Sequence, residues 1–554
     1  MKHTISFLHF LLCAALLPQD IHAQNTCQTK FLPVLHAYTD TVSYMEDGRT
    51  FQDYWIVEHE KHPDVKETTA NHITFFNSND TLAFTVKQGD INDFIIINSS
   101  GDSAFTRIVG VSANILENPP SWITEVAPSG KLTREQAAFD IDALAYTLSE
   151  VHPDMFAVCR QADFLSAVAR VKQSLPDSLT AVELFRRAAP LVTMIGDGHT
   201  SMYFPYNAYF TPERKRLPMR VEVTADGRLT ALSSVGGTVP DGAEIVSING
   251  HATADMIKAM LRYESGERDF FRMARLNNDF HALFGMMHEA DEYDVAYRTS
   301  EDGKTLHAMM KAATYDEIKR LTPEKGNEKT PAPYSFRILK DKNTAVMDFR
   351  SFENPEAMAA FADSMFTAIS HEGIRNLIID IRQNGGGNSA VGDVLLRYIS
   401  SKPFIQMAAA MTRITPTTQR LMGNRTMPTG IYFFESGDSA GFIKPLTAEE
   451  GRFKGRVYLL TSHKTFSSAS SFSWAFKEFG MGTVVGEETG GMSVAFGDIL
   501  PYRLPVSKLP CTISYKRFWL PGGDENDIHG TLPDYEVKQQ DALDKALQLI
   551  SEKR

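Results

Sequence analysis

The sequence is poor in cysteine and carries no excess of basic charge. Only 4 of its 554 residues are cysteines, and their scattered positions exclude a disulfide framework and a cysteine-based metal cluster. The formal net charge is −12 and no block of Lys or Arg occurs, so no nucleic-acid partner is expected. Beyond the N-terminus no apolar run is long enough to cross a bilayer, so no membrane span is expected.

The N-terminus has the pattern of a signal peptide. Lys2 precedes an apolar run, Ile5–Leu17, and the small residue Ala23 stands at the expected cleavage point. Residues 1–23 are therefore expected to be removed, which leaves Gln24 as the first mature residue. This predicts export to the periplasm, the cell surface or the extracellular space. The alternative is a buried N-terminal helix.

The remaining chain divides by its hydrophobic period, which changes several times along the sequence. Short runs of alternating apolar and polar residues predict strands, and apolar residues at helical spacing after Thr133 predict helices. In the final third of the chain, continuous apolar strands alternate with helices, as in an α/β core. We therefore expect a multidomain α+β protein. Its expected units are an N-terminal β-rich domain (24–126), a helical segment (131–206), a strand-rich module (215–315), an α/β core (334–540) and a C-terminal helix (541–554).

Three loops with turn-forming or small residues follow apolar segments. They read "GDGHT" (196–200), "RQNGGGNS" (382–389) and "TFSSAS" (465–470). Loops at the carboxyl ends of strands are where α/β folds place their sites. The glycines could form a plain turn, bind a phosphate or expose amides to an oxyanion; the run lacks the Lys-Ser/Thr ending of a nucleotide-binding loop.

The serine loop and a histidine offer the elements of nucleophilic catalysis. A serine before the helix-like run 472–479 could merely cap that helix, or it could attack a carbonyl near the positive end of the helix dipole. A serine nucleophile needs a base to take its proton, and His199 is the candidate. His463 and His529 are rival bases.

Taken together and in this order, the loops resemble the tail-specific (C-terminal processing) and tricorn-core serine peptidases. The elements that carry the resemblance are "LIIDIRQNGGGN", "TFSSAS…VVGEETGG", "GDGHT" and the closing "HGTLPDYEV". The module at 215–315, with "DGAEIVSING", resembles a PDZ domain. The resemblance covers roughly residues 131–540 and implies a crotonase/ClpP-like α/β protease core.

The resemblance assigns site residues by position. It implies Ser467 as the nucleophile and the amide of Ser468, with a glycine such as Gly385 or Gly386, as the oxyanion hole. One branch of the family uses a Ser–Lys dyad, but Met492 stands at its lysine position, and a thioether cannot relay a proton. The chain therefore resembles the Ser–His branch, in which His199 is the base.

That branch adds a supporting carboxylate and a supporting serine. The carboxylate would fall in "DENDIHGTLPD", where Glu525 fits the residue type and Asp527 fits the spacing. Gly198 stands where tricorn-type cores carry the serine, so Thr200 or Ser201 would have to replace it, or the role is vacant.

The resemblance thus implies an exported serine peptidase that acts on peptides or on unfolded or tail segments of proteins, without a metal or an organic cofactor. A second reading is a catalytically inactive relative that binds a peptide or another ligand. A third, an acyl-CoA enzyme with a crotonase-type core, explains neither the signal peptide nor the PDZ-like module. Substrate preference and oligomeric state stay open.

Overall fold

The computed structural model describes residues 121–299, 303–321, 332–436 and 441–552, together with Pro119 and the backbone of strands between residues 41 and 110. These N-terminal strands are antiparallel and form the orders β2-β1-β5-β4-β3 and β6-β7. Their bounds are β1 Thr41–Glu46, β2 Arg49–Gln52, β3 Val65–Thr69, β4 His72–Phe76, β5 Thr81–Lys87, β6 Asn92–Ile97 and β7 Phe105–Gly110. The predicted signal peptide, residues 1–23, lies outside the described residues.

A helical layer follows, formed by α4 (Arg134–Val151), α5 (Gln161–Gln173) and α6 (Ala181–Thr193). Helix α4 begins with a capping box: the Thr133 hydroxyl accepts the Gln136 N–H, and the Gln136 side chain accepts the Thr133 N–H. Short elements complete this layer: α3 Ser121–Thr124, β8 Leu132–Thr133, β9 Ser178–Leu179, β10 Ser201–Met202 and α7 Tyr206–Tyr209.

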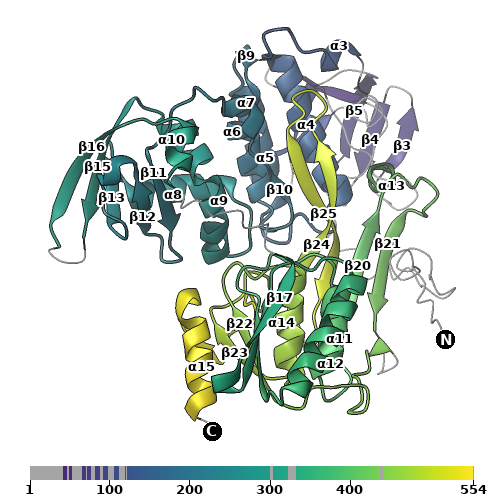
Figure 1. The fold of residues 1–554 in the computed structure, drawn as a ribbon. Helices are drawn as coiled ribbons and strands as arrows, with labels where there is room; N and C mark the ends of the chain where they lie inside the picture. Colours follow the sequence, from purple (N-terminus) through teal and green to yellow (C-terminus); the bar gives the residue numbers. More distant parts are fainter. Residues whose placement is uncertain are drawn as a thin grey trace.

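The next unit is an antiparallel sheet with the order β11-β12-β13-β15-β16, in which β14 also pairs with β13. A tight turn at Asn249-Gly250 joins β13 to β14, and both residues have positive φ angles, of 48° and 76°. The elements are β11 Met219–Val223, β12 Leu229–Ser234, η4 Val235–Gly237, β13 Glu244–Ile248, β14 His251–Ala252, α8 Thr253–Met260, η5 Leu261–Tyr263, α9 Asp269–His288, β15 Glu292–Arg298, β16 Thr305–Lys311 and α10 Tyr315–Lys319. Helix α9 lies between this sheet and the helical layer (Figure 1).

The predicted α/β core is present as a six-stranded sheet with the order β17-β18-β19-β22-β23-β26. Strands β18, β19, β22, β23 and β26 are parallel to one another, whereas β17 is antiparallel to β18. The elements are β17 Tyr334–Leu339, η6 Lys340–Lys342, β18 Thr344–Phe349, α11 Pro355–His371, β19 Asn376–Asp380, α12 Ala390–Ile399, β22 Arg456–Thr461, α14 Ser468–Glu478, β23 Thr483–Gly486, β26 Tyr535–Glu536, η8 Gln539–Asp541 and α15 Ala542–Glu552.

Both faces of this sheet are buried, which explains its continuous apolar strands. Leu377 and Ile379 of β19 pack with α11, α12 and α14 in one cluster. Ile378 between them points to the other face, where it packs with residues of α15 such as Leu549. The strand period of two therefore supplies both apolar layers from one run of residues.

A second sheet connects the core with the helical layer. Its order is β10-β25-β20-β21, with β24 paired to β25, and its long strands are β20 Ala409–Ile414, β21 Gly430–Glu435, β24 Val494–Arg503 and β25 Pro510–Trp519; α13 Pro416–Met422 follows β20. The hairpin of β24 and β25 runs from the core up to the helical layer (Figure 1). Ser201 of β10 pairs with Thr512 of β25. The loop before β10 is therefore anchored to the sheet that connects the core with the helical layer.

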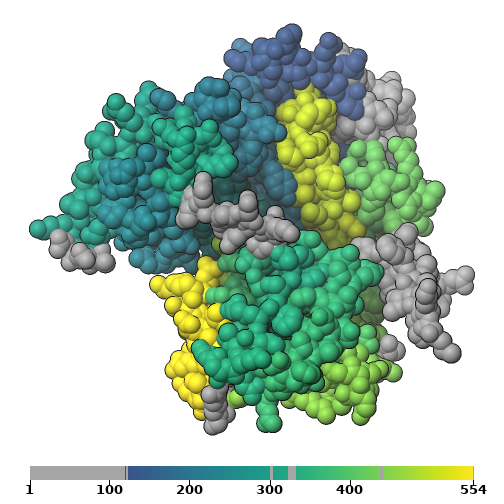
Figure 2. All heavy atoms as spheres, viewed as in Figure 1, coloured from purple at the N-terminus to yellow at the C-terminus, as the bar shows by residue number. Residues whose placement is uncertain are grey.

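A groove of about 1060 Å³ opens between the module of residues 219–311 and the α/β core. Val223 and Phe270 line it from the module, and Arg350, Arg382 and His463 line it from the core. The space-filling view shows the recess between these two parts (Figure 2). A search of the described residues found no helix with the length and apolarity needed to traverse a bilayer.

Candidate active site

Ser467 occupies a strained turn between strand β22 and helix α14. Its φ of 54° and ψ of −130° lie outside the regions that L residues ordinarily adopt. Strain of this kind costs on the order of 1–3 kcal/mol and persists where the surroundings enforce it, often at functional sites. The Ser467 side chain makes no capping hydrogen bond to α14. The capping interpretation therefore does not explain this serine.

The neighbouring serines use their hydroxyls to brace the loop. Ser468 Oγ donates to the carbonyl of Gly387 at 2.6 Å, and Ser470 Oγ donates to the carbonyl of Thr465 at 2.9 Å. Ser471 Oγ donates to the carbonyl of Ser468 at 3.1 Å, within the first turn of α14. Within the described parts of the chain, Ser467 is the serine of this group whose hydroxyl has no hydrogen bond. The structure thus distinguishes one reactive candidate from three structural hydroxyls.

The glycine loop contacts the serine turn directly. Strands β19 and β22 are parallel neighbours, so the loops after them meet at one edge of the sheet. Gly386 has a φ of 101°, and a Cβ atom placed on it would lie 2.7 Å from Ser467 Cβ. Gly387 has a φ of 138°, and a Cβ there would lie 2.5 Å from the Phe352 carbonyl oxygen. Both positions therefore require glycine for space and for backbone conformation.

The amides expected to form the oxyanion hole differ in their present partners. The Gly386 N–H donates to Asn384 Oδ1 at 2.9 Å, so it is engaged in this structure. Among the residues that the structure describes, no acceptor takes the N–H of Gly385 or of Ser468. The Ser468 N–H belongs to the residue at the start of α14, where the helix dipole favours a negative charge.

Replacing Gly386 by alanine tests this contact. The added methyl group would displace the Ser467 turn, and a displacement near 1 Å can lower the rate by about 10²-fold. We therefore expect Gly386→Ala to lower kcat for peptide hydrolysis by about that factor or more, measured with a purified, folded variant. In Gly385→Ala the new Cβ would meet no atom within 4 Å, so a smaller loss is expected. Equal losses in both variants would contradict the steric argument.

His199 lies in the loop between α6 and β10, and strand β25 holds that loop. Thr512 Oγ1 donates to the His199 carbonyl at 2.9 Å, and the Ser514 N–H donates to Thr200 Oγ1 at 3.0 Å. From α9, the Arg275 guanidinium donates to the Gly198 carbonyl and to Ser201 Oγ. Thr200 and Ser201 were considered for the supporting serine role. Their hydroxyl oxygens thus already accept hydrogen bonds, from the Ser514 N–H and from Arg275.

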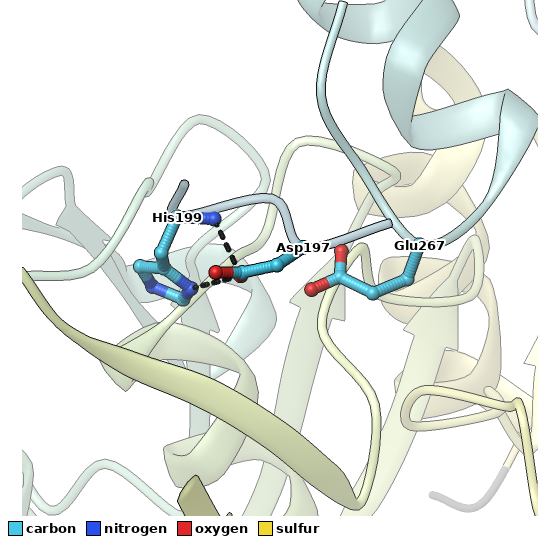
Figure 3. A group of neighbouring side chains, drawn as sticks. All are labelled: Asp197, His199 and Glu267. Atoms are coloured by element: carbon cyan, nitrogen blue, oxygen red, sulfur yellow. Dashed lines mark hydrogen bonds and ion pairs between the residues drawn. The ribbon is translucent and has the colours of Figure 1, made fainter. Parts of the chain in front are cut away.

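Asp197 is the carboxylate that holds the His199 loop (Figure 3). Its Oδ1 accepts the His199 backbone N–H at 2.8 Å and lies 3.8 Å from His199 Nδ1. Its Oδ2 accepts the Ser514 hydroxyl at 2.6 Å and lies 3.3 Å from His152 Nε2. Burial alone would raise the pKa of Asp197, but the side chains of His152 and His199 outweigh it and keep that pKa well below its usual range.

Glu267 reaches the same place from the segment before α9 (Figure 3). Its Oε1 accepts the Gly198 N–H at 3.1 Å, and its buried Oε2 has no hydrogen-bond partner among the described residues. Burial and the charge of Asp197 raise the pKa of Glu267 to about 7. Sequence reasoning missed both carboxylates: Asp197 stands inside the quoted "GDGHT", whereas no local pattern marks Glu267.

The expected supporting carboxylates bond elsewhere. Glu525 accepts a hydrogen bond from Trp519 Nε1 at 3.1 Å and pairs with Arg517 at 3.2 Å. Asp527 Oδ1 accepts the His529 backbone N–H at 2.9 Å. Neither is hydrogen-bonded to the His199 ring, whose two nitrogens have no hydrogen-bond partner within the described ranges. Local bonds hold the 525–527 loop, so the carboxylates that the structure brings to His199 are Asp197 and Glu267.

The aromatic ring of Phe466 links the histidine to the serine turn. It stacks on the His199 ring with centroids 4.4 Å apart and on the Phe271 ring with centroids 4.2 Å apart. Because Phe466 directly precedes Ser467, this stack places His199 beside the nucleophile turn. No hydrogen bond joins Ser467 to His199 in this structure. Catalytic hydrogen bonds are often long before substrate binds, so side-chain rotation is needed to engage the pair.

The two rival bases are already engaged. His463 Nδ1 contacts the Glu488 carbonyl at 3.0 Å, and His529 Nδ1 contacts Glu488 Oε1 at 3.1 Å. Both histidines therefore have a hydrogen-bonded ring nitrogen, unlike His199, whose ring nitrogens make no hydrogen bond within the described residues. Met492, at the position of the lysine in the Ser–Lys branch, offers no proton acceptor.

Comparisons with known proteins match one family model and several solved structures. Residues 343–537 match the model of the family described as Peptidase family S41. The crystal structure of mature CPAF is similar at a TM-score of 0.55 and 15% identity, over 76% of this chain and 98% of that one. Mature CPAF complexed with lactacystin gives 0.55 and 14%, over 76% and 98%. The photosystem II D1 C-terminal processing protease gives 0.39 and 14%, over 75% and 97%.

Proposed function

We propose that this chain, which contains a domain of peptidase family S41 and is a serine-type peptidase, cleaves peptide bonds through an acyl-enzyme on Ser467 with His199 as the general base. The observation that carries the proposal is the conformation of Ser467. Its backbone is strained, and its side-chain hydroxyl has no hydrogen bond among the described residues. A strained strand-to-helix turn is a known way to expose a nucleophile.

The proposed reaction uses the groups around this turn in sequence. His199 takes the Ser467 proton as Oγ attacks the peptide carbonyl, and it then returns a proton to the leaving amine. The amide of Ser468, with a glycine amide of 385–386, receives the oxyanion; each such donor is typically worth about 10²–10³ in rate. Asp197 acts as a positioning residue, because its ionised carboxylate holds the backbone and Nδ1 side of His199.

The proposed substrates are peptides and the unfolded or tail segments of proteins. The groove between the module of residues 219–311 and the core supports this, since His463 and Lys464 of its lining precede Ser467 by only a few residues. An extended chain laid in this groove would pass the serine loop. Both basic and acidic side chains line the groove, which suits a peptide backbone better than an apolar ligand.

Covalent labelling tests the proposed nucleophile. A fluorophosphonate probe is expected to modify the purified full chain once, and peptide mass mapping should place the adduct on Ser467. The parent protein should also hydrolyse an unfolded protein substrate. Peptide binding without labelling and without hydrolysis would favour the reading of an inactive binding relative.

Export is part of the proposal, supported by the apolar run Ile5–Leu17 and the small residue Ala23. When the full chain is expressed with its natural leader in a secreting bacterial host, the exported form is expected to begin at Gln24. N-terminal sequencing of that protein checks this, and a mature form that still begins at Met1 would contradict it.

A further inference from the structure

Asp197, His199 and Glu267 form a compact group of potential metal ligands. One ligand atom from each of the three side chains lies within 4.8 Å of the others. Figure 3 shows that they converge from two segments, the loop before β10 and the segment before α9. Such a group, with one imidazole and two carboxylates, is a common donor set for a transition-metal cation.

Several of these atoms lack partners although they are buried. In the described part of the chain, Glu267 Oε2 and both ring nitrogens of His199 have no hydrogen bond. Buried polar groups are normally satisfied, so such a cluster calls for a ligand, an ion or a water. The carboxylate groups of Asp197 and Glu267 also have oxygen atoms within 4.8 Å of each other, and like charges at such a distance repel each other. A divalent cation would relieve this repulsion and satisfy the vacant lone pairs together.

We propose that Asp197, His199 and Glu267 bind a divalent transition-metal cation of the zinc class. Zinc bonds to imidazole nitrogen and carboxylate oxygen at about 2.0–2.2 Å, so the ligand atoms need to approach one another by a modest side-chain rotation. Glu267 Oε2 has no hydrogen bond among the described residues, so rotation of the carboxylate about its Oε1 contact with the Gly198 N–H can make that movement. Calcium and magnesium fit less well, because both prefer ligand sets made of oxygen.

The surroundings of the site already orient these ligands. His152 and Ser514 contact Asp197 Oδ2, and the Gly198 N–H holds Glu267 Oε1. Groups that fix the first ligands in this way are a regular feature of metal sites, and their loss typically lowers metal affinity. With three protein ligands, a fourth position would remain for water.

Metal binding at His199 would prevent this residue from acting as the general base, an inference that rests on the proposed function. The nitrogen nearest Asp197 is His199 Nδ1, at 3.8 Å. A cation on the Nδ1 lone pair leaves the single proton of neutral imidazole on Nε2. Nε2 then cannot accept the Ser467 proton. The cation would therefore act as a reversible inhibitor rather than as a catalytic cofactor.

Metal titration of the full chain tests the site. After chelator treatment, Zn²⁺ is added and followed by calorimetry, and Co²⁺ by visible absorption. One equivalent is expected to bind in the micromolar range or tighter, and Glu267→Gln should weaken binding by at least about tenfold. The matched control is Glu264→Gln, which changes another buried carboxyl close by in sequence and should bind Zn²⁺ as the parent does.

Inhibition is measured separately. Zn²⁺ should slow fluorophosphonate labelling of Ser467 with the same midpoint as binding, and chelator should restore the rate. The proposal is overturned if the parent does not bind one equivalent of Zn²⁺. It is also overturned if Glu267→Gln and His199→Ala both bind Zn²⁺ as the parent does. His199→Ala keeps the test decisive in case the Glu267→Gln chain misfolds. If the chain binds Zn²⁺ but is not labelled at Ser467 even in its metal-free form, the metal site is upheld and the proposed function is contradicted instead.

Discussion

Ser467→Ala is expected to lower kcat/KM for hydrolysis of an unfolded protein or peptide by about 10⁴–10⁶-fold, the loss seen when the serine of a serine–histidine pair is removed. The physical reason is that no other hydroxyl of the loop stands on the strained turn: those of Ser468, Ser470 and Ser471 donate to backbone carbonyls. The measurement compares steady-state rates of purified parent and variant. KM should change much less than kcat, because the hydroxyl acts in the chemical step.

Ser471→Ala is the matched control for this change. It removes a hydroxyl of the same helix turn whose hydrogen bond to the Ser468 carbonyl is internal to α14. Its rate should stay within a few-fold of the parent. If Ser467→Ala and the parent hydrolyse substrate equally, the assignment of the nucleophile is wrong. Equal, large losses in both variants would instead indicate that the loop had lost its structure.

His199→Ala is expected to cause a loss of similar size, about 10⁴–10⁶-fold in kcat, because a serine and its base act as one unit. For the same reason, the double variant with Ser467→Ala should be no slower than Ser467→Ala alone. The small cavity left by the imidazole lies beside the Phe466 ring, and added imidazole should restore part of the rate. Such rescue would separate loss of a base from a loss of structure.

His463→Ala is the control for the base. His463 precedes Ser467 closely in sequence and is half-buried, but its Nδ1 bonds to the Glu488 carbonyl and its ring packs on Phe270 at 4.3 Å. We expect kcat to remain near that of the parent, whereas KM can rise because His463 lines the proposed substrate groove. A large loss in His463→Ala together with a small loss in His199→Ala would reverse the assignment of the base.

The sequence predicted the sheet core and the meeting of two of the loops. The run from Asn376 to Asp380 and the run from Arg456 to Thr461 are continuous and apolar, which indicated parallel strands buried on both faces. The family resemblance placed the amide of Ser468 and a glycine amide in one oxyanion hole, so the glycine and serine loops were expected together. The contact of Gly386 with the Ser467 turn agrees with that expectation.

The sequence did not predict which carboxylates accompany His199. Family spacing placed the supporting group at Glu525 or Asp527, but these side chains are held by Arg517, Trp519 and the His529 amide. Glu267 stands 68 residues after His199 and belongs to no local pattern. Its approach depends on how α9 packs against the His199 loop, which no local signal in either segment encodes.

By itself, then, the sequence determined the chemistry of individual loops and the hydrophobic periodicity of individual helices and strands. These include the glycines that permit positive φ angles, the serines that start α14, and the thioether of Met492 at the position where the resembling Ser–Lys branch carries its lysine. Only the tertiary structure decided that Ser467 takes a strained backbone, that Phe466 joins its turn to His199, and that Asp197 and Glu267 flank the imidazole. The reason is physical: periodicity and turn chemistry act between residues close in sequence, whereas burial, charge and side-chain contact arise from segments that packing brings together.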